Sequence, residues 1–209
     1  MKARLLICFA LLLAALPPTA AEAVEPNGSF IRLTTNKYVY RIVGGAPLRI
    51  WQCAPLNNCE GVKDVANLTG YRPYPADGAI VRNLADGGTY RFAGGAPLWI
   101  SSCGYAPTCA GRYDLNNLAD TAHIRAMPAD GTVVRNVNDG GFYRFAGGAP
   151  LFVRCDMGAG CTAPTMIDGQ TMAKLGTYTP AAPRMRQFPP DGVVVVNGDD
   201  NQHFRFAGV

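Results

Sequence analysis

A five-residue peptide, Gly-Gly-Ala-Pro-Leu, occurs three times and constrains the fold more than any other feature of this sequence. The copies lie at 44–48, 94–98 and 147–151. An Asn-Gly or Asp-Gly pair precedes each copy, with its glycine 16 positions before the first glycine of the copy. A fourth pair, at 191–192, stands in the same relation to Gly208. Four copies at one spacing, without gaps, predict a repeated structural unit.

The second copy shows how one unit is built from short strands and turns. Pro75–Gly78 has the composition of a turn, and residues 79–83 are rich in β-branched side chains, as in a strand. A second turn at 84–88 leads to residues 89–93, in which aromatic residues alternate with Arg91. Residues 98–102 alternate in the same way. The local pattern therefore predicts a β unit.

The repeated peptide itself indicates a break between two strands. Gly94 and Gly95 allow the chain to bend or bulge, because glycine accepts backbone conformations closed to other residues. Pro97 lacks the N–H that a central strand donates, and Leu98 begins the next buried face. The segment that follows each copy differs in length; in unit 2 it predicts a helical turn at Asp114–Asp120 and a fourth strand at His123–Pro128.

These elements predict an all-β fold made of tandem repeats, with about four short antiparallel strands each. The expected units are 24–74, 75–127, 128–188 and a partial one at 189–209. Since the fourth copy holds only the first two strands, we favour an open array that ends in a capping hairpin. A closed β-trefoil or a small propeller-like ring is the alternative.

Residues 1–23 have the pattern of a secretory signal peptide. Lys2 and Arg4 precede an apolar run at 5–16, and the small-residue triplet Ala21-Glu22-Ala23 follows. The run is shorter than the roughly 20 residues of a membrane helix, and no later span is apolar enough. Only seven residues precede Cys8, which argues against a lipoprotein signal. We therefore expect a secreted protein without a transmembrane segment, either extracellular or at the cell surface.

The six cysteines beyond the signal form three pairs of one form, each with five residues between. In an oxidising compartment such pairs indicate disulfides. Each pair follows its own glycine-rich peptide, so we expect each bond to close within one unit. A zinc site is the alternative, but this spacing is unusual for zinc and histidine ligands are lacking. The expected bonds are Cys53–Cys59, Cys103–Cys109 and Cys155–Cys161.

The peptides "GGAPLRI", "GGAPLWI" and "GGAPLFV" resemble the tandem Gly-Gly-Ala-Pro-Leu-Tyr-Val type repeats of exported actinobacterial proteins. The resemblance covers essentially all of Pro26–Val209. It implies export and repetition, and it carries no activity or binding residues to this chain.

The sequence lacks the motifs of common enzymes, and we expect no catalytic residues and no cofactor. It has no G-x-S-x-G, no HExxH and no phosphate-binding glycine loop. The two histidines, His123 and His203, stand in unrelated positions. Aspartates in the turns, such as Asp86 and Asp139, could bind calcium, but they serve turns more often and the spacing of a calcium loop is missing, so no metal site is expected. An inhibitor or enzyme based on the long segment Thr162–Phe188 is a further alternative.

An arginine recurs at one position of every unit, next to an aromatic residue. One interpretation is structural, with each guanidinium bonding turn carbonyls or an aspartate of the neighbouring unit. The other is a row of ligand sites formed with nearby exposed aromatics. The candidate ligand-binding residues are Arg41, Arg91, Arg144, Arg205, Trp51, Trp99 and Phe152.

The composition limits the classes of partner that this chain can be expected to bind. The formal net charge is only +4, without a basic run, so we expect no nucleic-acid partner for an exported protein. Repeated units with one shallow site each suit a polymer through multivalency. We therefore expect a binding module for cell-wall or extracellular polysaccharide. A structural or protein-interaction repeat that meets a surface protein, without a small-molecule ligand, is the alternative.

Overall fold

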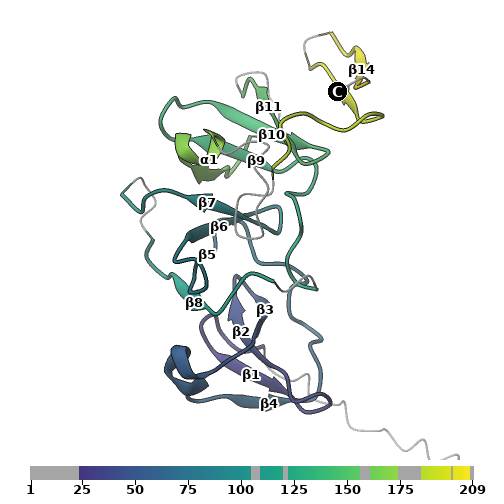
Figure 1. Cartoon of the computed structure of the whole chain (residues 1–209). Coiled ribbons are helices and arrows are strands. Elements are labelled where there is room, and N and C mark those ends of the chain that lie inside the picture. Colours follow the sequence, from purple (N-terminus) through teal and green to yellow (C-terminus); the bar gives the residue numbers. More distant parts are fainter. Residues whose placement is uncertain are drawn as a thin grey trace, which may run out of the picture.

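The computed structural model describes residues 24–104, 109–119, 122–155, 161–173, 185–198 and 200–207. The expected signal peptide lies outside these ranges. The described chain is mostly β: three four-stranded sheets follow one another in chain order, and a two-stranded hairpin comes last (Figure 1). The described residues form no closed barrel, so the tandem arrangement agrees with an array of repeats rather than with a trefoil or ring.

Each sheet comes from one unit, and the three have the same topology. Unit 1 contains β1 (Phe30–Leu33), β2 (Val39–Val43), β3 (Ala46–Ile50) and β4 (Lys63–Val65). Unit 2 contains β5 (Ile80–Asn83), β6 (Thr89–Ala93), β7 (Ala96–Ile100) and β8 (Tyr113–Leu115). Unit 3 contains β9 (Val133–Asn136), β10 (Phe142–Ala146), β11 (Ala149–Val153) and β12 (Thr165–Ile167). In every sheet the spatial order is third, second, first and fourth strand.

The fourth strand of each unit differs from the prediction in its direction and, in unit 2, in its position. It runs parallel to the first strand, whereas the sequence predicted antiparallel strands throughout. In unit 2 this strand, β8, includes Asp114 and Leu115, where a helical turn was expected. The expected fourth strand at His123–Pro128 has no strand structure. A three-residue parallel strand leaves almost no periodic signal, because it is too short to alternate and needs no adjoining turn.

The glycine pair of the repeated peptide forms a two-residue hairpin turn. In unit 2, Gly94 and Gly95 connect β6 to β7 with φ of 55° and 79°. Positive φ at both central residues defines the type I′ turn, whose twist matches that of the flanking strands. The pair is thus a tight turn, and Pro97 lies on the edge strand β7, where no ladder donor is needed.

The same turn also joins neighbouring units. The Gly94 carbonyl accepts a hydrogen bond from the N–H of Ala129 in unit 3, at 3.1 Å, and the Gly95 carbonyl accepts one from Arg125 at 2.9 Å. A Cβ atom on Gly94 would lie 2.6 Å from the Ala129 nitrogen. Glycine is therefore required both by the turn and by the approach of the next unit.

All three expected disulfides are present. Their Cα–Cα distances are 5.0, 5.1 and 5.6 Å, and each bond closes a short loop after the third strand of its own unit. In unit 1 the loop contains the 3₁₀ helix η1 (Ala54–Cys59). These bonds confirm the predicted pairing and fit an extracellular module.

The units stack face to face, and the cores lie between them. We call the sheet face that looks toward the next unit the C-side face, and the opposite one the N-side face. In junction 1/2, Leu48 and Ile50 on the C-side face of unit 1 share a core cluster with Val81 and Phe92 on the N-side face of unit 2. In junction 2/3, Leu98 packs in the same way with two buried residues of unit 3, Val134 and Phe145.

The N-terminal end of the array is closed by its own unit. Ile31 and Ile42 on the N-side face of unit 1 are completely buried. Leu68 and Tyr71, from the loop after β4, pack against them. Unit 1 therefore has a finished core without a preceding unit.

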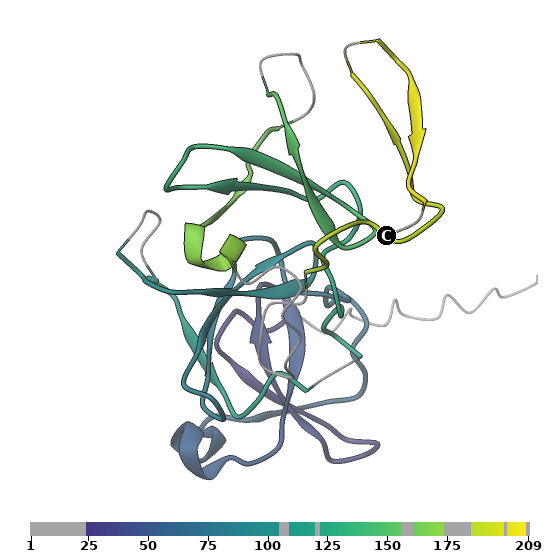
Figure 2. The same ribbon diagram turned by 45° about the horizontal axis from the view of Figure 1, so that its top comes forward.

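Among the described residues, the C-terminal end is less completely covered. The hairpin pairs β13 (Val194–Val196) with β14 (His203–Arg205), and it stands away from the body of the array (Figure 2). Between β12 and the hairpin, helix α1 (Gly169–Ala173) packs on β7; residues 174–184 of the long segment Thr162–Phe188 lie outside the described ranges. Neither α1 nor any other helix in the described ranges has the length and apolar character needed to cross a membrane.

Candidate ligand-binding surface

The repeated arginines of units 1 and 2 connect neighbouring units. Nη1 of Arg41 donates to the backbone carbonyl of Asp114 on β8, at 2.9 Å. Nη1 of Arg91 donates to the carbonyl of Met166 on β12, at 2.7 Å. Asp114 and Met166 are the middle residues of the fourth strands of units 2 and 3. Each arginine thus reaches from the second strand of one unit to the fourth strand of the next.

Both guanidinium groups are held in a largely dry environment. Only 3% of Arg91 is exposed, and Arg41 is partly buried. Burial lowers the pKa of Arg91, opposed by the negative charge of Asp168. Burial likewise lowers the pKa of Arg41, opposed mainly by Asp114. Arginine remains charged, so Arg91 is a buried cation and Arg41 a partly buried one, and their hydrogen bonds link the stacked units.

The other two arginines of the row lie at the C-terminal end. Arg144, on β10, lines a cavity between unit 3 and the hairpin. Arg205, on β14, is exposed. The structure therefore does not bring the four arginines together on one open surface.

The candidate aromatic residues occupy different environments. Trp51 is 51% exposed and Phe152 is 66% exposed, whereas Trp99 is half-buried and packs against the core of junction 1/2. Phe152 contacts Tyr143 edge to face, with 5.8 Å between ring centroids. Burial raises the pKa of Tyr143, and the charge of nearby Asp139 adds to the effect.

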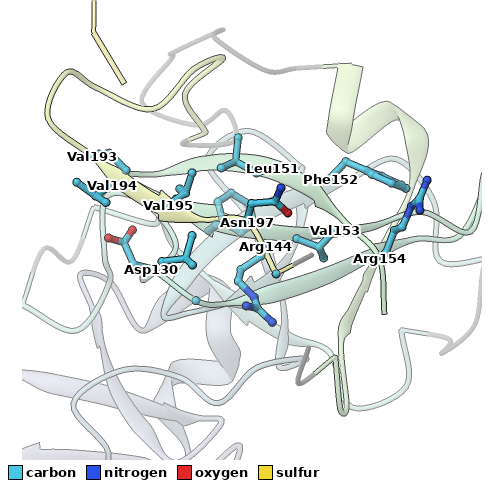
Figure 3. Close-up of a pocket in the computed structure, with 15 residues that line it drawn as sticks. Asp130, Arg144, Leu151, Phe152, Val153, Arg154, Val193, Val194, Val195 and Asn197 are labelled. Carbon is cyan, nitrogen blue, oxygen red and sulfur yellow. The ribbon is translucent and has the colours of Figure 1, made fainter. Parts of the chain in front are cut away.

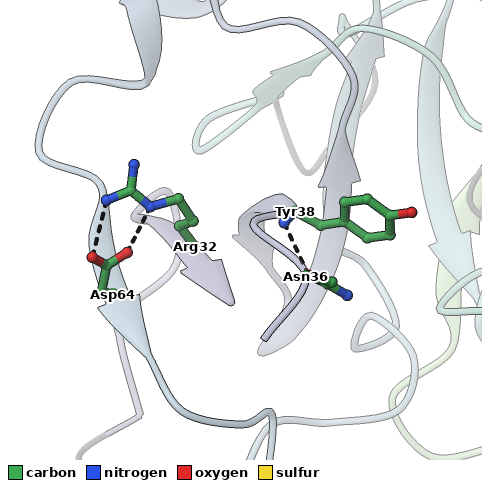
Figure 4. A network of polar contacts seen from close by, with 4 residues as sticks. All are labelled: Arg32, Asn36, Tyr38 and Asp64. Atoms are coloured by element: carbon green, nitrogen blue, oxygen red, sulfur yellow. Dashed lines mark hydrogen bonds and ion pairs between the residues drawn. The ribbon is translucent and has the colours of Figure 1, made fainter. Parts of the chain in front are cut away.

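A cluster at the N-terminal end, which we call the aromatic-arginine cluster, consists of Tyr38, Arg49 and Trp51. The guanidinium carbon of Arg49 lies 3.7 Å from the ring centroid of Tyr38 and 4.0 Å from that of Trp51. Both rings are about half exposed. The Tyr38 N–H donates to the side-chain oxygen of Asn36 at 2.9 Å, which fixes the turn that carries the ring (Figure 4). Sequence reasoning included Trp51 but missed its two partners.

Beside this turn, an Arg–Asp pair joins the parallel strands. Arg32 on β1 makes two hydrogen bonds to Asp64 on β4, at 2.6 and 2.9 Å (Figure 4). The hydrogen bond from Arg32 lowers the pKa of Asp64. Arg82 and Asp114 form the same pair in unit 2. In both units the ion pair links the side chains of the first and fourth strands and so holds these two strands together.

The turn aspartates that could have bound calcium are engaged within their turns. Asp86 accepts the backbone N–H of Gly88 at 2.7 Å, the amide of Asn83 at 2.7 Å and the hydroxyl of Tyr90 at 2.8 Å. Asp139 accepts equivalent backbone and amide donors in unit 3. No group of three or more metal-binding side chains is positioned to hold an ion in the parts of the chain that the structure describes.

Two polar residues at the junctions were missed by sequence reasoning. The side-chain oxygen of Asn116 accepts the backbone N–H groups of Trp51 and Gln52, both at 3.1 Å. Asp168, 3% exposed, accepts the N–H of Ser101 at 2.8 Å. Each acceptor directly follows a fourth strand, and Ala66 stands at that place in unit 1, which follows no other unit within the described ranges. A comparison of the residues after the fourth strands would have revealed this, had those strands been recognised.

A cavity of about 800 Å³ lies between unit 3 and the hairpin. Its walls come from β11 and β13, and Figure 3 shows Arg144, Leu151 and Val195 around it. We call it the C-terminal groove.

Comparison of the chain with known protein families, with curated proteins and with solved structures found no match.

Proposed function

We propose that this chain is a secreted binding module without catalytic activity, whose ligand is a cell-wall or extracellular polysaccharide. The aromatic-arginine cluster is the observation that carries the proposal. It offers two half-exposed rings and a cation on a disulfide-stapled β framework, which suits a ligand with apolar faces and polar edges.

The cluster is suited to sugars for a physical reason. Aromatic rings that are amphipathic and only half-buried supply contact area at little cost in side-chain entropy, and a sugar ring presents an apolar C–H face to them. Arg49 stacks between the two rings, so they are held in place before a ligand arrives. Its guanidinium edge can donate to hydroxyl or carboxylate groups of the polymer.

The repeated arginines Arg41 and Arg91 have a structural role rather than a role in ligand binding in this proposal. Arg41 and Arg91 donate to backbone carbonyls of the next unit, which favours the structural interpretation for these two. The binding residues that we propose are therefore Trp51 with Tyr38 and Arg49, and the exposed Phe152 as a second contact. Two contacts in one rigid array would bind a polymer more tightly than either alone.

Co-sedimentation with insoluble polymers tests this proposal. The oxidised protein is mixed with peptidoglycan, cellulose, chitin or xylan at low and high salt. We expect saturable binding to one of them, weakened about tenfold or more by Trp51→Ala, as for an aromatic hot spot. Trp99→Phe is the matched control, because unit 3 has Phe152 at the equivalent position. This variant should bind the polymer normally. It also leaves Trp51 as the only tryptophan fluorophore. Absence of binding to every polymer would contradict the proposal.

A second candidate function is that of a protein-interaction array at the cell surface. The C-terminal groove favours it, because its lining is largely apolar and comes from strand edges. Such a function would use the end of the array rather than the aromatic-arginine cluster.

A further inference from the structure

Each internal junction contains the fourth strand of the following unit in a similar setting. An aliphatic side chain that ends the strand is buried in the core, as Leu115 is in junction 1/2 and Ile167 in junction 2/3. The middle carbonyl of the strand accepts from Arg41 or Arg91. The next residue, Asn116 or Asp168, accepts a backbone N–H just beyond the third strand of the preceding unit.

The C-side face of unit 3 has the corresponding residues without the corresponding strand. Leu151 is at the position of Leu48 and Leu98, which are 1% and 0% exposed, yet it is only partly buried. Arg144 and Arg154 line the groove above it. The Arg154 N–H, which corresponds to those of Trp51 and Ser101, has no acceptor like Asn116 or Asp168 among the described residues. The groove thus lies where a fourth strand lies in the other junctions.

The hairpin leaves the edge of β13 open beside this groove. The equivalent strands β1, β5 and β9 each pair with a parallel fourth strand, whereas β13 pairs only with β14 in the described chain. Val193–Val196 line the groove. Sheet edges in natural proteins are commonly protected by proline or charge. The third strands have Pro47, Pro97 and Pro150, while β13 consists of valines.

We propose that the C-terminal groove binds an extended segment of another polypeptide, which adds as a parallel strand to the edge of β13. The segment places an aliphatic side chain between β13 and Leu151. An aspartate or asparagine at its next position accepts the Arg154 N–H. Because Arg144 and Arg154 both line the groove, aspartate is the better residue there. This is strand addition at a sheet edge, with main-chain hydrogen bonds for affinity and one pocket for specificity.

The internal junctions argue for a separate polypeptide rather than a second copy stacked end to end. The N-side face of unit 1 already has its own cover, since Ile31 and Ile42 are fully buried. Unit 1 also has Ala66 where an acceptor for the Arg154 N–H would be needed. A second copy could instead pair its β13 with β13, because valine would face valine at every position. That arrangement makes a dimer and is distinguished below.

A peptide copied from β8 provides a defined probe. Gly111–Asn117 (GRYDLNN), labelled with fluorescein, is titrated with the oxidised full protein and followed by fluorescence anisotropy. We expect saturable binding, weakened about tenfold or more when the leucine of the peptide is replaced by aspartate, because a buried aliphatic contact is lost. Replacing the asparagine that follows this leucine with aspartate should strengthen binding. No saturable binding by the parent peptide would overturn the proposal.

A proline at the open edge tests the mode of binding. The N–H of Asn197 donates to the Gln202 carbonyl within the hairpin, so by alternation the N–H of Val196 points to the open edge. Val196→Pro should abolish peptide binding and keep the hairpin, since proline is tolerated where the N–H is unpaired. Val196→Thr keeps the N–H and should bind normally. Leu151→Asp is the second variant, with circular dichroism to check the fold.

Two further measurements distinguish a peptide in the groove from a second copy of the chain, and peptide binding from polysaccharide binding. Sedimentation velocity of the protein alone should show a monomer; a dimer that Val196→Pro dissociates would overturn the proposal in favour of β13–β13 pairing. Trp51→Ala should bind the peptide normally. Because Phe152 lines the groove, Val196→Pro is judged by the part of polysaccharide binding that depends on Trp51, and it should keep that part. The two proposals therefore fail independently.

Discussion

Junction 1/2 and junction 2/3 reach the same backbone contacts with different side chains. Arg41 and Arg91 both donate to the middle carbonyl of a fourth strand, although that residue is Asp114 in one unit and Met166 in the other. The carboxylate of Asp114 binds Arg82 of its own unit instead. A contact made to the backbone lets the side chain vary, so the junction is preserved while the sequence of the fourth strand changes.

The two junctions differ in how they balance charge. Arg91 is more deeply buried than Arg41, and the carboxylate near it, Asp168, is itself buried, whereas the carboxylate near Arg41 is Asp114, which also pairs with Arg82. A buried cation costs several kcal/mol unless an opposite charge or hydrogen bonds compensate it. Junction 2/3 therefore depends more strongly on its polar residues than junction 1/2 does. The following variants test that difference, starting with the largest expected effect.

Arg91→Ala should destabilise the protein most. It removes the hydrogen bond to Met166 and leaves the buried Asp168 without the nearby cation, for an expected loss of about 4 kcal/mol. Arg41→Ala should cost about half as much, because a hydrogen bond to a charged group contributes roughly 2 kcal/mol. Urea unfolding measures both. Arg82→Ala, which breaks a partly exposed ion pair, is the control and should cost about 1 kcal/mol or less. A stable Arg91→Ala protein that has lost polymer binding would instead support a ligand-binding role.

Loss of the side-chain acceptor after the fourth strand should likewise destabilise junction 2/3 more than junction 1/2. Asp168→Ala leaves the Ser101 N–H and the start of α1 without an acceptor and should cost about 3 kcal/mol. Asn116→Ala should cost about 1 kcal/mol, since its donors lie at an exposed site. Thermal unfolding in parallel samples provides the comparison. Equal losses would show that burial does not distinguish the two junctions.

Substitution of Gly94 tests the contact between this turn and the following unit. Gly94→Ala should cost about 2 to 3 kcal/mol, because a left-handed backbone is strained for alanine and the new Cβ would meet the Ala129 nitrogen. Gly87→Ala also has positive φ, 72°, but nothing lies within 4 Å of its Cβ position. It should cost about 1 kcal/mol. If the two variants unfold at the same denaturant concentration, the turn does not constrain the next unit.

The exposed Arg32–Asp64 pair should have the smallest effect. Its hydrogen bond lowers the folded-state pKa of Asp64, so the pair contributes stability above the unfolded pKa of about 4 and loses it as pH falls through the folded value. Asp64→Asn should therefore lower the melting temperature slightly at pH 7 and not at pH 2. A difference that persists unchanged at pH 2 would show that the ionised carboxylate is not its cause.

Much of the fold was accessible from local sequence. The turn residues predicted the three antiparallel strands of each unit, and the position of each cysteine pair within its unit predicted the disulfides. Of the candidate site, Trp51 and Phe152 are exposed, and their role in binding stays a prediction. The stacking of Arg49 between Tyr38 and Trp51 could not be predicted, because it joins a turn to a different strand.

By itself, the sequence determined the repeat, the turns and the disulfide pairing, since each depends on residues close together in the chain. Only the tertiary structure decided where the fourth strand pairs, which units the arginines connect and which described strand edge has no partner strand. A parallel strand and a stacked face are joined through segments of varying length and composition. Their partners are therefore selected by packing and hydrogen bonding in three dimensions, which no local pattern records.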